Sequence, residues 1–268
     1  MRAVILSGVS GGIGLATAKK LIEAGYHVFG LDIKEVKEDI KELTYIKTDL
    51  RDLSSIELAY QQINSKVKEV DAIISMAGIY DINSLVEISE EDFKRIFDIN
   101  VFAVYRLNKV FLPLLKEKGK VIIVSSELAP LDPLPFTGLY GITKSTIEKY
   151  AYSLRMELQL LNKQVVVIRP GAVNTTLLDD STNGIKRFSN NTELYKYNAN
   201  KFMSITNKVE AKKIPPERIA KLTNKILKKK KPKYVYKINR NKLLILLNIM
   251  PDRFQNWVIK KILLFKKK

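Results

Sequence analysis

The chain has 268 residues, 46% of them hydrophobic, which is enough to form one sizeable core in an α/β domain. It has no cysteine and one histidine, His27, so disulfides, thiolate or multi-histidine metal sites, and a Ser-His-Asp triad built on any other histidine are excluded, and no metal is expected. The net charge of +18 is uneven, because residues 212–268 carry +17 and residues 1–211 carry +1.

Short apolar runs alternate with longer helical patterns along the first two-thirds of the chain. The runs predict strands over 2–7, 27–32, 45–49, 70–75, 120–125 and 165–169, and an edge strand over 232–238. Helices are predicted from the glycine turn after Ser7 to Gly25, and over about 53–66, 90–116 and 140–162. Apolar strands joined by helices are typical of a parallel sheet covered on both faces. We therefore expect an α/β fold, a Rossmann-type doubly wound parallel sheet of about seven strands, followed by a C-terminal helical tail.

A glycine-rich turn, Ser-Gly-Val-Ser-Gly-Gly-Ile-Gly, occupies residues 7–14, directly after the first predicted strand. Glycine lets the backbone turn tightly and approach a pyrophosphate, and the free N–H groups of the following helix point at that anion. A simple strand-to-helix connection is the alternative, but the strand–turn–helix context favours a dinucleotide site. The cofactor contacts expected from this turn come from Ser7, Gly8, Ser10, Gly12, Ile13 and Gly14.

Asp32 ends the second predicted strand, eighteen residues beyond Gly14. A carboxylate there can accept both ribose hydroxyls and would repel a 2′-phosphate. Ile33 is not basic and the glycine turn has no Arg or Lys, so NAD is favoured over NADP, with Lys34 close enough to keep NADP as the alternative. An ordinary turn carboxylate is the other interpretation of Asp32.

Later strand ends supply further candidate cofactor contacts. Asp49 is expected to end the third strand and could accept the adenine amino group, with Leu50 next to it. Ala77 and Gly78 follow the fourth strand, where small residues permit close packing beside a cofactor.

Tyr140 and Lys144 begin a predicted helix at positions i and i+4, which share one helix face. A free tyrosine has a pKa of about 10. We expect the ammonium group of Lys144 to lower that pKa, so that Tyr140 could act as a base near neutral pH. A surface pair on a helix is the alternative for an isolated Tyr-x-x-x-Lys match.

Together, these motifs resemble those of the short-chain dehydrogenase/reductase family, in its branch of roughly 250 residues, over about residues 1–175. The glycine turn is similar to the family's Thr-Gly-x-x-x-Gly-x-Gly, with Ser7 in place of threonine. Asn100 matches the family's helical asparagine, Ser126 its catalytic serine, and Tyr140 and Lys144 its Tyr-x-x-x-Lys. The segment 169–175 matches the Pro-Gly segment that lies along the nicotinamide.

The resemblance implies a role for each matched residue. Tyr140 would take the proton from the alcohol, or return it to the forming alkoxide in the reverse direction. Lys144 would lower the pKa of Tyr140 and hold the nicotinamide ribose. Ser126 would hydrogen-bond the substrate oxygen. Asn100 would keep a proton relay to Lys144. The Pro-Gly segment would contact the nicotinamide through Pro170, Gly171, Val173 and Thr175.

Two departures from the family pattern are visible. The usual Asn-Asn-Ala-Gly is here Ser75-Met76-Ala77-Gly78, so Met76 cannot supply a side-chain amide, and that hydrogen bond is lost or replaced. The interval from Ser126 to Tyr140 is one residue longer than the common spacing, with Ser125 as the fallback serine.

The rest of the chain divides into a predicted lid and a basic extension. Residues 176–211 lie where family members carry the segment that covers the substrate. Residues 1–211 would then form the catalytic domain, and residues 212–268 a basic C-terminal extension that completes the fold. The apolar lid residues would line a pocket for a lipophilic substrate, or simply pack the lid on the body: Leu177, Leu178, Phe188, Tyr195, Tyr197, Phe202 and Met203.

The extension mixes lysines with apolar residues, and a helix is predicted to start at Pro251. A basic helix with Trp and Phe on one face is typical of a helix that lies in a membrane interface. Helices that cover the substrate cleft or a subunit contact are the alternative. The residues predicted to share that face are Phe254, Trp257, Val258, Ile262 and Phe265.

We therefore expect an NAD-dependent oxidoreductase acting on the CH–OH group of a lipophilic substrate such as a steroid, retinoid or long-chain alcohol. An NADP-dependent reductase and an NAD-binding regulator without turnover are the alternatives, and the complete set of four reacting residues argues against the regulator.

The expected partners and location follow from the same motifs. The tail lacks a nucleic-acid motif, so no nucleic-acid partner is expected. No window reaches the ~20 apolar residues of a spanning helix, and the N-terminal apolar run is too short for a signal peptide. We expect a cytoplasmic protein, with peripheral membrane contact through the tail. The resemblance implies a homodimer or homotetramer through the helices around 90–116 and 140–162.

Overall fold

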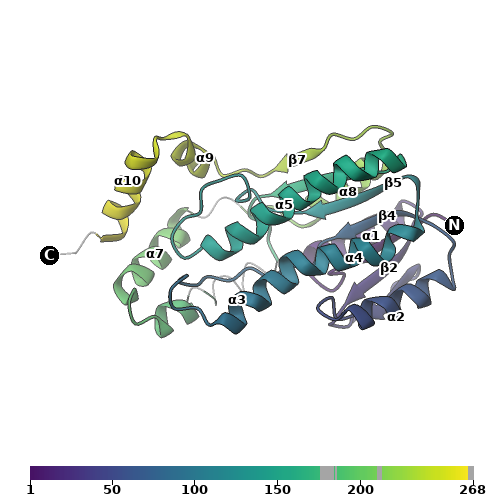
Figure 1. Cartoon of the computed structure of the whole chain (residues 1–268), viewed down its shortest axis with the longest axis horizontal. Coiled ribbons are helices and arrows are strands. Elements are labelled where there is room, and N and C mark those ends of the chain that lie inside the picture. The colour runs from purple at the N-terminus through teal and green to yellow at the C-terminus, as the bar shows by residue number, and fades with distance from the viewer. Residues whose placement is uncertain (176–183, 185, 210–212, 265–268) are drawn as a thin grey trace.

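The computed structural model describes residues 1–175, 184, 186–209 and 213–264. A seven-stranded sheet forms its centre, in the order β3-β2-β1-β4-β5-β6-β7, and every neighbouring pair is parallel (Figure 1). The strands are β1 Ala3–Ser7, β2 His27–Asp32, β3 Leu43–Lys47, β4 Val70–Ser75, β5 Leu115–Val124, β6 Gln164–Pro170 and β7 Val235–Ile238. The predicted Rossmann-type sheet is confirmed, including its edge strand.

The strand order reverses between β1 and β4, which makes this position the switch point of the sheet. Chain order runs outward from β1 through β2 to β3 on one side, and from β4 to β7 on the other. Ser7 and Ser75 pair in register, so β1 and β4 end at the same level. A crevice outside the carboxyl ends of such strands is where ligands bind in open α/β sheets. The predicted glycine turn and small-residue turn both start there.

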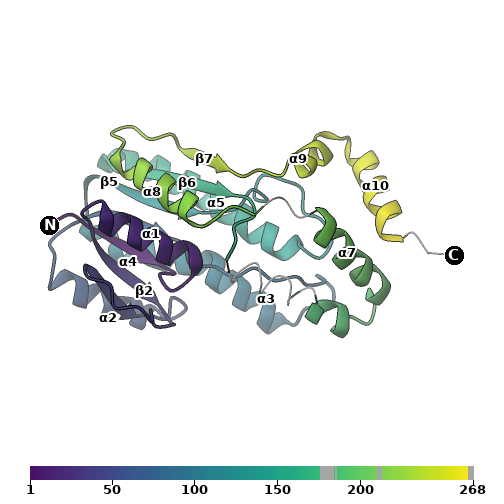
Figure 2. The same ribbon diagram turned by 180° about the vertical axis from the view of Figure 1, so that it is seen from behind.

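Helices cover the two faces of the sheet (Figure 2). Each face has its own apolar core. On one face lie α1, Gly12–Glu23, and α8, Glu217–Lys228, which pack against each other. On the other face lie α2, Leu53–Asn64, α4, Ala103–Phe111, and α5, Gly138–Leu158. Because α8 and β7 belong to residues 212–268, the basic extension contributes a core helix and an edge strand to the fold.

The predicted helix over 90–116 is wrong as a single element. It divides into α3, Glu90–Phe97, a π-helical turn, Asp98–Phe102, and α4, and a 3-10 turn, Leu112–Leu114, follows α4. Pro113 lies in that last turn, and a proline cannot donate the N–H that would continue an α-helix. Strand β5 already begins at Leu115, earlier than predicted, and its pairing with β4 shifts register between Val70 and Ala72.

Two further predicted boundaries are corrected. Strand β3 ends at Lys47, so Asp49 lies in the connection to α2 and not at a strand end. Helix α5 ends at Leu158, and a short 3-10 turn, Gln159–Leu161, completes the predicted 140–162 segment.

The lid and the tail lie together at one end of the molecule (Figure 1). Helix α7 spans Lys196–Val209, and residues 186–191 form a shorter helix before it. The tail contains α9, Lys242–Ile249, and α10, Asp252–Leu264, and α10 contacts α7. Leu177, Leu178 and Phe265 lie outside the described residues. In the part of the chain that the structure describes, no helix combines the length and apolarity needed to cross a membrane.

Candidate functional site

The glycine turn is shaped by contacts that only glycine permits. Gly8 has a φ of +74°, and a Cβ on it would lie 2.6 Å from the backbone nitrogen of Ala77. A Cβ on Gly14 would lie 1.9 Å from the carbonyl oxygen of Gly8, and one on Gly12 would lie 2.9 Å from Cγ2 of Thr175. The start of α1 therefore packs closely against the segments that follow β4 and β6. This close-packed turn at the N-terminus of α1 has the form expected of a pyrophosphate site.

Asp32 lies at the end of β2 as predicted and faces the glycine turn. Its two carboxylate oxygens accept hydrogen bonds from the backbone N–H groups of Ser10 and Lys34, each at 3.0 Å. These bonds fix the carboxylate beside the turn, where it fits the expected role of accepting ribose hydroxyls. Ile13 lies at the start of α1, and its side chain packs against a small apolar cluster around Val173.

Asp49 and Leu50 have partners of their own in this structure. The Asp49 carboxylate forms an ion pair with Arg51, with Nη2 at 2.6 Å, and this hydrogen bonding holds the Asp49 pKa below its usual range. The Leu50 side chain packs on the α2–α4–α5 core, and its carbonyl oxygen accepts a hydrogen bond from Arg106 at 3.5 Å. Their contact with adenine stays a prediction.

The end of β6 and the segment after it make two kinds of contact, one at Pro170 and Gly171 and another at Val173. Gly171 packs against the end of β7, since a Cβ on it would lie 1.8 Å from the carbonyl oxygen of Asn239, and the Pro170 carbonyl accepts a hydrogen bond from the Glu127 N–H at 2.8 Å. Val173 forms a parallel bridge with Ile214.

The hydrogen bonds of that bridge leave part of Val173 facing the site. They use the carbonyl of Ala172 and the N–H of Asn174. Backbone groups alternate along an extended chain, so the N–H and carbonyl of Val173 point to the opposite side. That orientation suits the expected contact with a carboxamide.

Ser126, and not Ser125, is the serine beside Tyr140. A hydrogen bond joins the Ser126 and Tyr140 side chains, and Ser126 Oγ also accepts one from the Leu128 N–H at 3.2 Å. The Ser125 hydroxyl is buried without a hydrogen-bond partner among the described residues. The longer loop before Tyr140 therefore leaves the Ser126–Tyr140 pairing intact.

Tyr140 and Lys144 lie on one face of α5, as predicted, and both are buried, with 9% and 6% of their surfaces exposed. The Lys144 Nζ lies 5.6 Å from the centre of the Tyr140 ring and donates to the Val124 carbonyl at 3.4 Å. Burial raises the pKa of Tyr140 to about 12, with an opposing effect from the Ser126 hydrogen bond. Burial also lowers the pKa of Lys144 to about 8, which the Glu148 carboxylate partly offsets.

The Tyr140 pKa is thus shifted upward by burial and not downward as expected from Lys144, and the effect of Lys144 on it stays a prediction. Burial is the larger of the two causes, because a buried site disfavours the charged phenolate, and the Ser126 hydrogen bond opposes it. A phenol with a pKa of about 12 is a proton donor at neutral pH.

Asn100 lies inside the π-helical turn between α3 and α4. Its amide accepts a hydrogen bond from the Ile79 N–H at 2.8 Å, and donates to the Ile79 carbonyl at 2.9 Å and to the Thr143 hydroxyl at 3.2 Å. A Cβ on Gly78 would lie 3.3 Å from the Asn100 amide oxygen and 3.5 Å from the Lys144 Nζ. Asn100 thus ties the turn after β4 to α5 beside Lys144. Such π-turns often occur at functional sites, and the proton relay stays a prediction.

Met76 occupies the place of the family's asparagine, and Ser7 provides a substitute hydrogen bond. The backbone N–H of Met76 lies 3.3 Å from both the carbonyl and the hydroxyl oxygens of Ser7. The Met76 side chain packs on the core of the α1–α8 face. The β1–β4 junction is therefore held without a side-chain amide.

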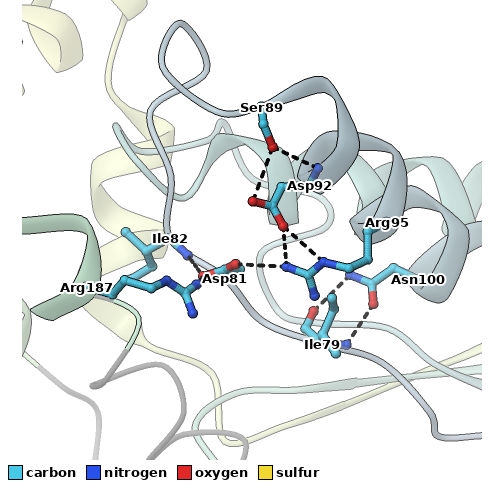
Figure 3. A network of polar contacts seen from close by, with 8 residues as sticks. All are labelled: Ile79, Asp81, Ile82, Ser89, Asp92, Arg95, Asn100 and Arg187. Atoms are coloured by element: carbon cyan, nitrogen blue, oxygen red, sulfur yellow. Dashed lines mark hydrogen bonds and ion pairs between the residues drawn. The ribbon is translucent and has the colours of Figure 1, made fainter. Parts of the chain in front are cut away.

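Sequence reasoning missed a network that joins the lid to the body (Figure 3). Asp81, in the segment after β4, accepts hydrogen bonds from Arg187 of the lid at 2.5 Å and from the Ile82 N–H at 3.0 Å. Arg95 of α3 lies 3.7 Å from the same carboxylate and is itself held by Asp92 at 2.8 Å. Asp81 and Arg187 are 106 residues apart, so no local spacing could have predicted their pairing.

Tyr80 is a second residue that the sequence analysis missed. Its ring contacts Tyr140 edge to face, with centroids 4.5 Å apart. Tyr80 also packs on an apolar cluster that includes Ile82, Phe188 and Phe202. Phe188 and Phe202 are themselves buried, so the lid aromatics pack the lid on the body next to the reacting centre.

Comparisons with known proteins show which family the chain is similar to. A family model described as short chain dehydrogenase matches residues 2–186. A 3-ketodihydrosphingosine reductase from Bacteroides thetaiotaomicron is 29% identical over 179 residues, covering 66% of this chain and 66% of that protein. An NADPH-dependent 3-dehydrocapnine reductase from Ornithobacterium rhinotracheale is 32% identical over 200 residues, covering 69% and 70%. Mitochondrial D-beta-hydroxybutyrate dehydrogenase from Mus musculus is 32% identical over 185 residues, covering 63% and 54%.

The matches thus span less than two thirds of the length of the Bacteroides and mouse proteins. Solved structures are similar over more of the chain. A short chain dehydrogenase family protein from Francisella tularensis superposes with a TM-score of 0.73 and 25% identity, covering 89% of this chain and 97% of that one. A short-chain dehydrogenase from Streptomyces avermitilis gives 0.77 and 21%, covering 97% and 95%, which supports the fold.

Proposed function

This chain belongs to the short-chain dehydrogenase/reductase family, and we propose that it transfers a hydride between NAD(H) and the hydroxyl or carbonyl group of a lipophilic substrate. One observation carries the proposal: the buried Tyr140 hydroxyl is hydrogen-bonded to Ser126, one helical turn from Lys144. The Lys144 ammonium lies close to Gly78, in the turn after β4. Proton transfer and orientation need this combination of side chains.

In the reductive direction, Tyr140 donates its proton to the oxygen of the substrate. Its high pKa keeps the phenol protonated near neutral pH. Ser126 orients that oxygen, and the Lys144 ammonium stabilises the phenolate left behind. NADH, when bound, would supply the hydride. The protonated phenol is the form of Tyr140 that carbonyl reduction requires.

NAD is the proposed cofactor because Asp32 presents a fixed carboxylate beside the glycine turn. That charge suits two ribose hydroxyls and opposes a 2′-phosphate. One relative is NADPH-dependent by name, so the choice of cofactor needs a direct measurement.

A lipophilic substrate is proposed because apolar side chains adjoin Tyr140. Tyr80 contacts its ring, and the cluster around Ile82, Phe136 and the lid lies next to it. Two relatives are reductases by name, of 3-ketodihydrosphingosine and of 3-dehydrocapnine, which supports a ketone as the oxidised substrate.

A panel of ketones of increasing chain length, assayed with NADH and with NADPH, tests the proposal. We expect NADH to be consumed, with kcat/KM rising roughly threefold to fourfold for each CH₂ group that the pocket buries. Turnover that is independent of chain length would refute the lipophilic substrate. Turnover with NADPH alone would refute the cofactor assignment.

A further inference from the structure

We propose that α9 and α10 form a surface, the tail face, that docks this protein on an anionic lipid bilayer. The outer side of α9 carries the first part of it. Leu243, Leu246 and Ile249 recur every third residue, and 54%, 55% and 75% of their surfaces are exposed. The inner side of α9 is already occupied, since Leu244 and Leu247 line a small cavity against the loop before Tyr140. The three exposed side chains on the outer side of α9 are therefore not needed to pack the fold.

Helix α10 extends the tail face with aromatic side chains. Phe254 and Trp257 are about half exposed and stack on each other, with ring centroids 5.7 Å apart. Leu264 is also half exposed, whereas Gln255 on the other side of the helix is buried. A helix that presents Trp, Phe and Leu outward and a packed side inward has the pattern of an interfacial helix. Of the residues predicted to share the outer face, Val258 is instead half-buried.

Positive charge surrounds these apolar groups. The described residues 240–264 contain five Lys or Arg and a single acid, Asp252, giving a net charge of +4. Lys242, Arg253, Lys260 and Lys261 are exposed beside the apolar side chains. Such a combination attracts anionic headgroups while the apolar groups enter the acyl boundary. The charge thus specifies the composition of the bilayer.

Figures 1 and 2 show α9 and α10 projecting at one end of the molecule. The lysine run at 228–231 precedes β7, whereas α9 follows β7, so the run lies at the other end of that strand. Only part of the basic extension therefore belongs to the tail face. A flat surface can meet this end without contacting the sheet.

A second copy of the chain fits the tail face less well than a bilayer does. A two-fold contact would place the same patch on both subunits, so each segment 240–264, with its charge of +4, would face another of equal charge. A membrane with anionic lipid supplies both the apolar interior and the opposite charge. The bilayer is therefore the occupant that complements the surface.

The tail face contacts the lid through side-chain packing and a hydrogen bond. Leu263, on α10, packs on the cluster of Ile82 and Phe202, and its carbonyl accepts a hydrogen bond from Asn198 of α7 at 3.0 Å. Docking would thus hold the lid, and the reacting centre behind it, at the membrane surface. The further consequence, that substrate enters from the bilayer, rests on the proposed lipophilic substrate, whereas docking itself does not.

Trp257 is the only tryptophan of the chain and reports on the tail face directly. The full-length protein would be mixed with vesicles of phosphatidylcholine, with or without about 30% phosphatidylglycerol. We expect a blue shift of the Trp257 emission and co-sedimentation with the anionic vesicles, at least roughly tenfold stronger than with neutral ones, and release by about 0.5 M salt. No cofactor or substrate is present, so the result does not depend on the proposed activity.

Matched variants locate the contact. Leu246→Glu and the pair Lys260→Glu with Lys261→Glu should each weaken binding by roughly tenfold or more. Leu160→Glu is the control, because Leu160 is 82% exposed beyond the far end of α5 from the tail. Circular dichroism checks that each variant is folded.

Three results would overturn the proposal. Equal binding to neutral and anionic vesicles would refute the role of charge, and unchanged binding in both tail variants would place the contact elsewhere. A Trp257 shift that grows with protein concentration without vesicles would show that a second copy covers the tail face.

Discussion

Burial shifts both ionisable side chains of the reacting centre away from their usual pKa values. It raises the pKa of Tyr140 to about 12 and lowers that of Lys144 to about 8. The phenol is therefore protonated over the whole working range, while the lysine loses its charge at mildly alkaline pH. In the proposed mechanism, reduction needs the protonated Tyr140 and the charged Lys144 together.

The pH dependence of carbonyl reduction follows from these two groups. Lys144 is charged below its pKa of about 8 and neutral above it. We expect kcat to be level below that pH and to fall above it, approaching about tenfold for each pH unit. Lys144→Arg keeps a charge at every working pH, so its remaining activity should lose this fall. A wild-type rate that rises through pH 9 would contradict the assignment.

The carboxylate of Asp32 is expected to set the preference for NADH over NADPH. In Asp32→Ala the ribose hydroxyls lose a charged acceptor, so KM for NADH should rise by roughly tenfold to a hundredfold, and the preference over NADPH should shrink. Glu35→Gln removes an exposed carboxylate three residues away and serves as the control. Steady-state kinetics with both cofactors measures the effect. An unchanged NADH/NADPH ratio in Asp32→Ala would show that the carboxylate only caps the turn.

The motif residues could be predicted because each depends on short-range spacing. Gly14 approaches the Gly8 carbonyl within the same turn, and Tyr140 and Lys144 share one helix face, so their pattern is visible in the sequence. The pKa of Tyr140 could not be predicted, because burial depends on the whole fold. Tyr80 could not be predicted either, since nothing in its local sequence indicates that its ring meets Tyr140.

At the scale of elements, apolar periodicity located the sheet well and the helices less well. All seven strands were predicted because buried parallel strands form continuous apolar runs. The segment 90–116 was misread because α3, the π-turn and α4 continue one another with helical dihedrals. The π-turn directs Asn100 toward Ile79 and Thr143. No local sequence pattern indicates this change in the helical hydrogen-bond register.

The lid is the element whose attachment is most open to experiment. Arg187 reaches Asp81 from an exposed position, while Asp81 itself is buried. Because an exposed partner limits the strength of an ion pair, Arg187→Gln should raise KM for a ketone by no more than about fivefold. Asp81→Asn should raise KM further, since Asp81 also holds the Ile82 N–H.

A double-mutant cycle measures the pairing between lid and body. The effects of Arg187→Gln and Asp81→Asn should not add, because each removes the same contact. Lys186→Gln removes a neighbouring exposed charge of the lid and is the control. Additive effects on KM would show that the contact does not hold the lid during turnover.

At the scale of the whole molecule, α4 and α5 present exposed apolar side chains away from the sheet. Phe102 and Tyr105 are 50% and 44% exposed on the α4 side, and Tyr152 and Met156 are 53% and 45% exposed on α5. The expected homodimer or homotetramer would bury this surface. We predict that Tyr105→Glu with Met156→Glu lowers the mass measured by sedimentation velocity, whereas Leu58→Glu on α2 does not. A wild-type monomer at micromolar concentration would refute the assembly.

The central claim is that Tyr140 supplies the proton while bound NADH supplies the hydride. The most direct test measures NADH oxidation with an active ketone by the wild type, by Tyr140→Phe, and by Tyr152→Phe, a matched change at an exposed position of the same helix. We expect Tyr140→Phe to lower kcat by roughly 10²–10⁴-fold, with NADH binding retained and Tyr152→Phe unaffected. A Tyr140→Phe enzyme that turns over at the wild-type rate would contradict the account.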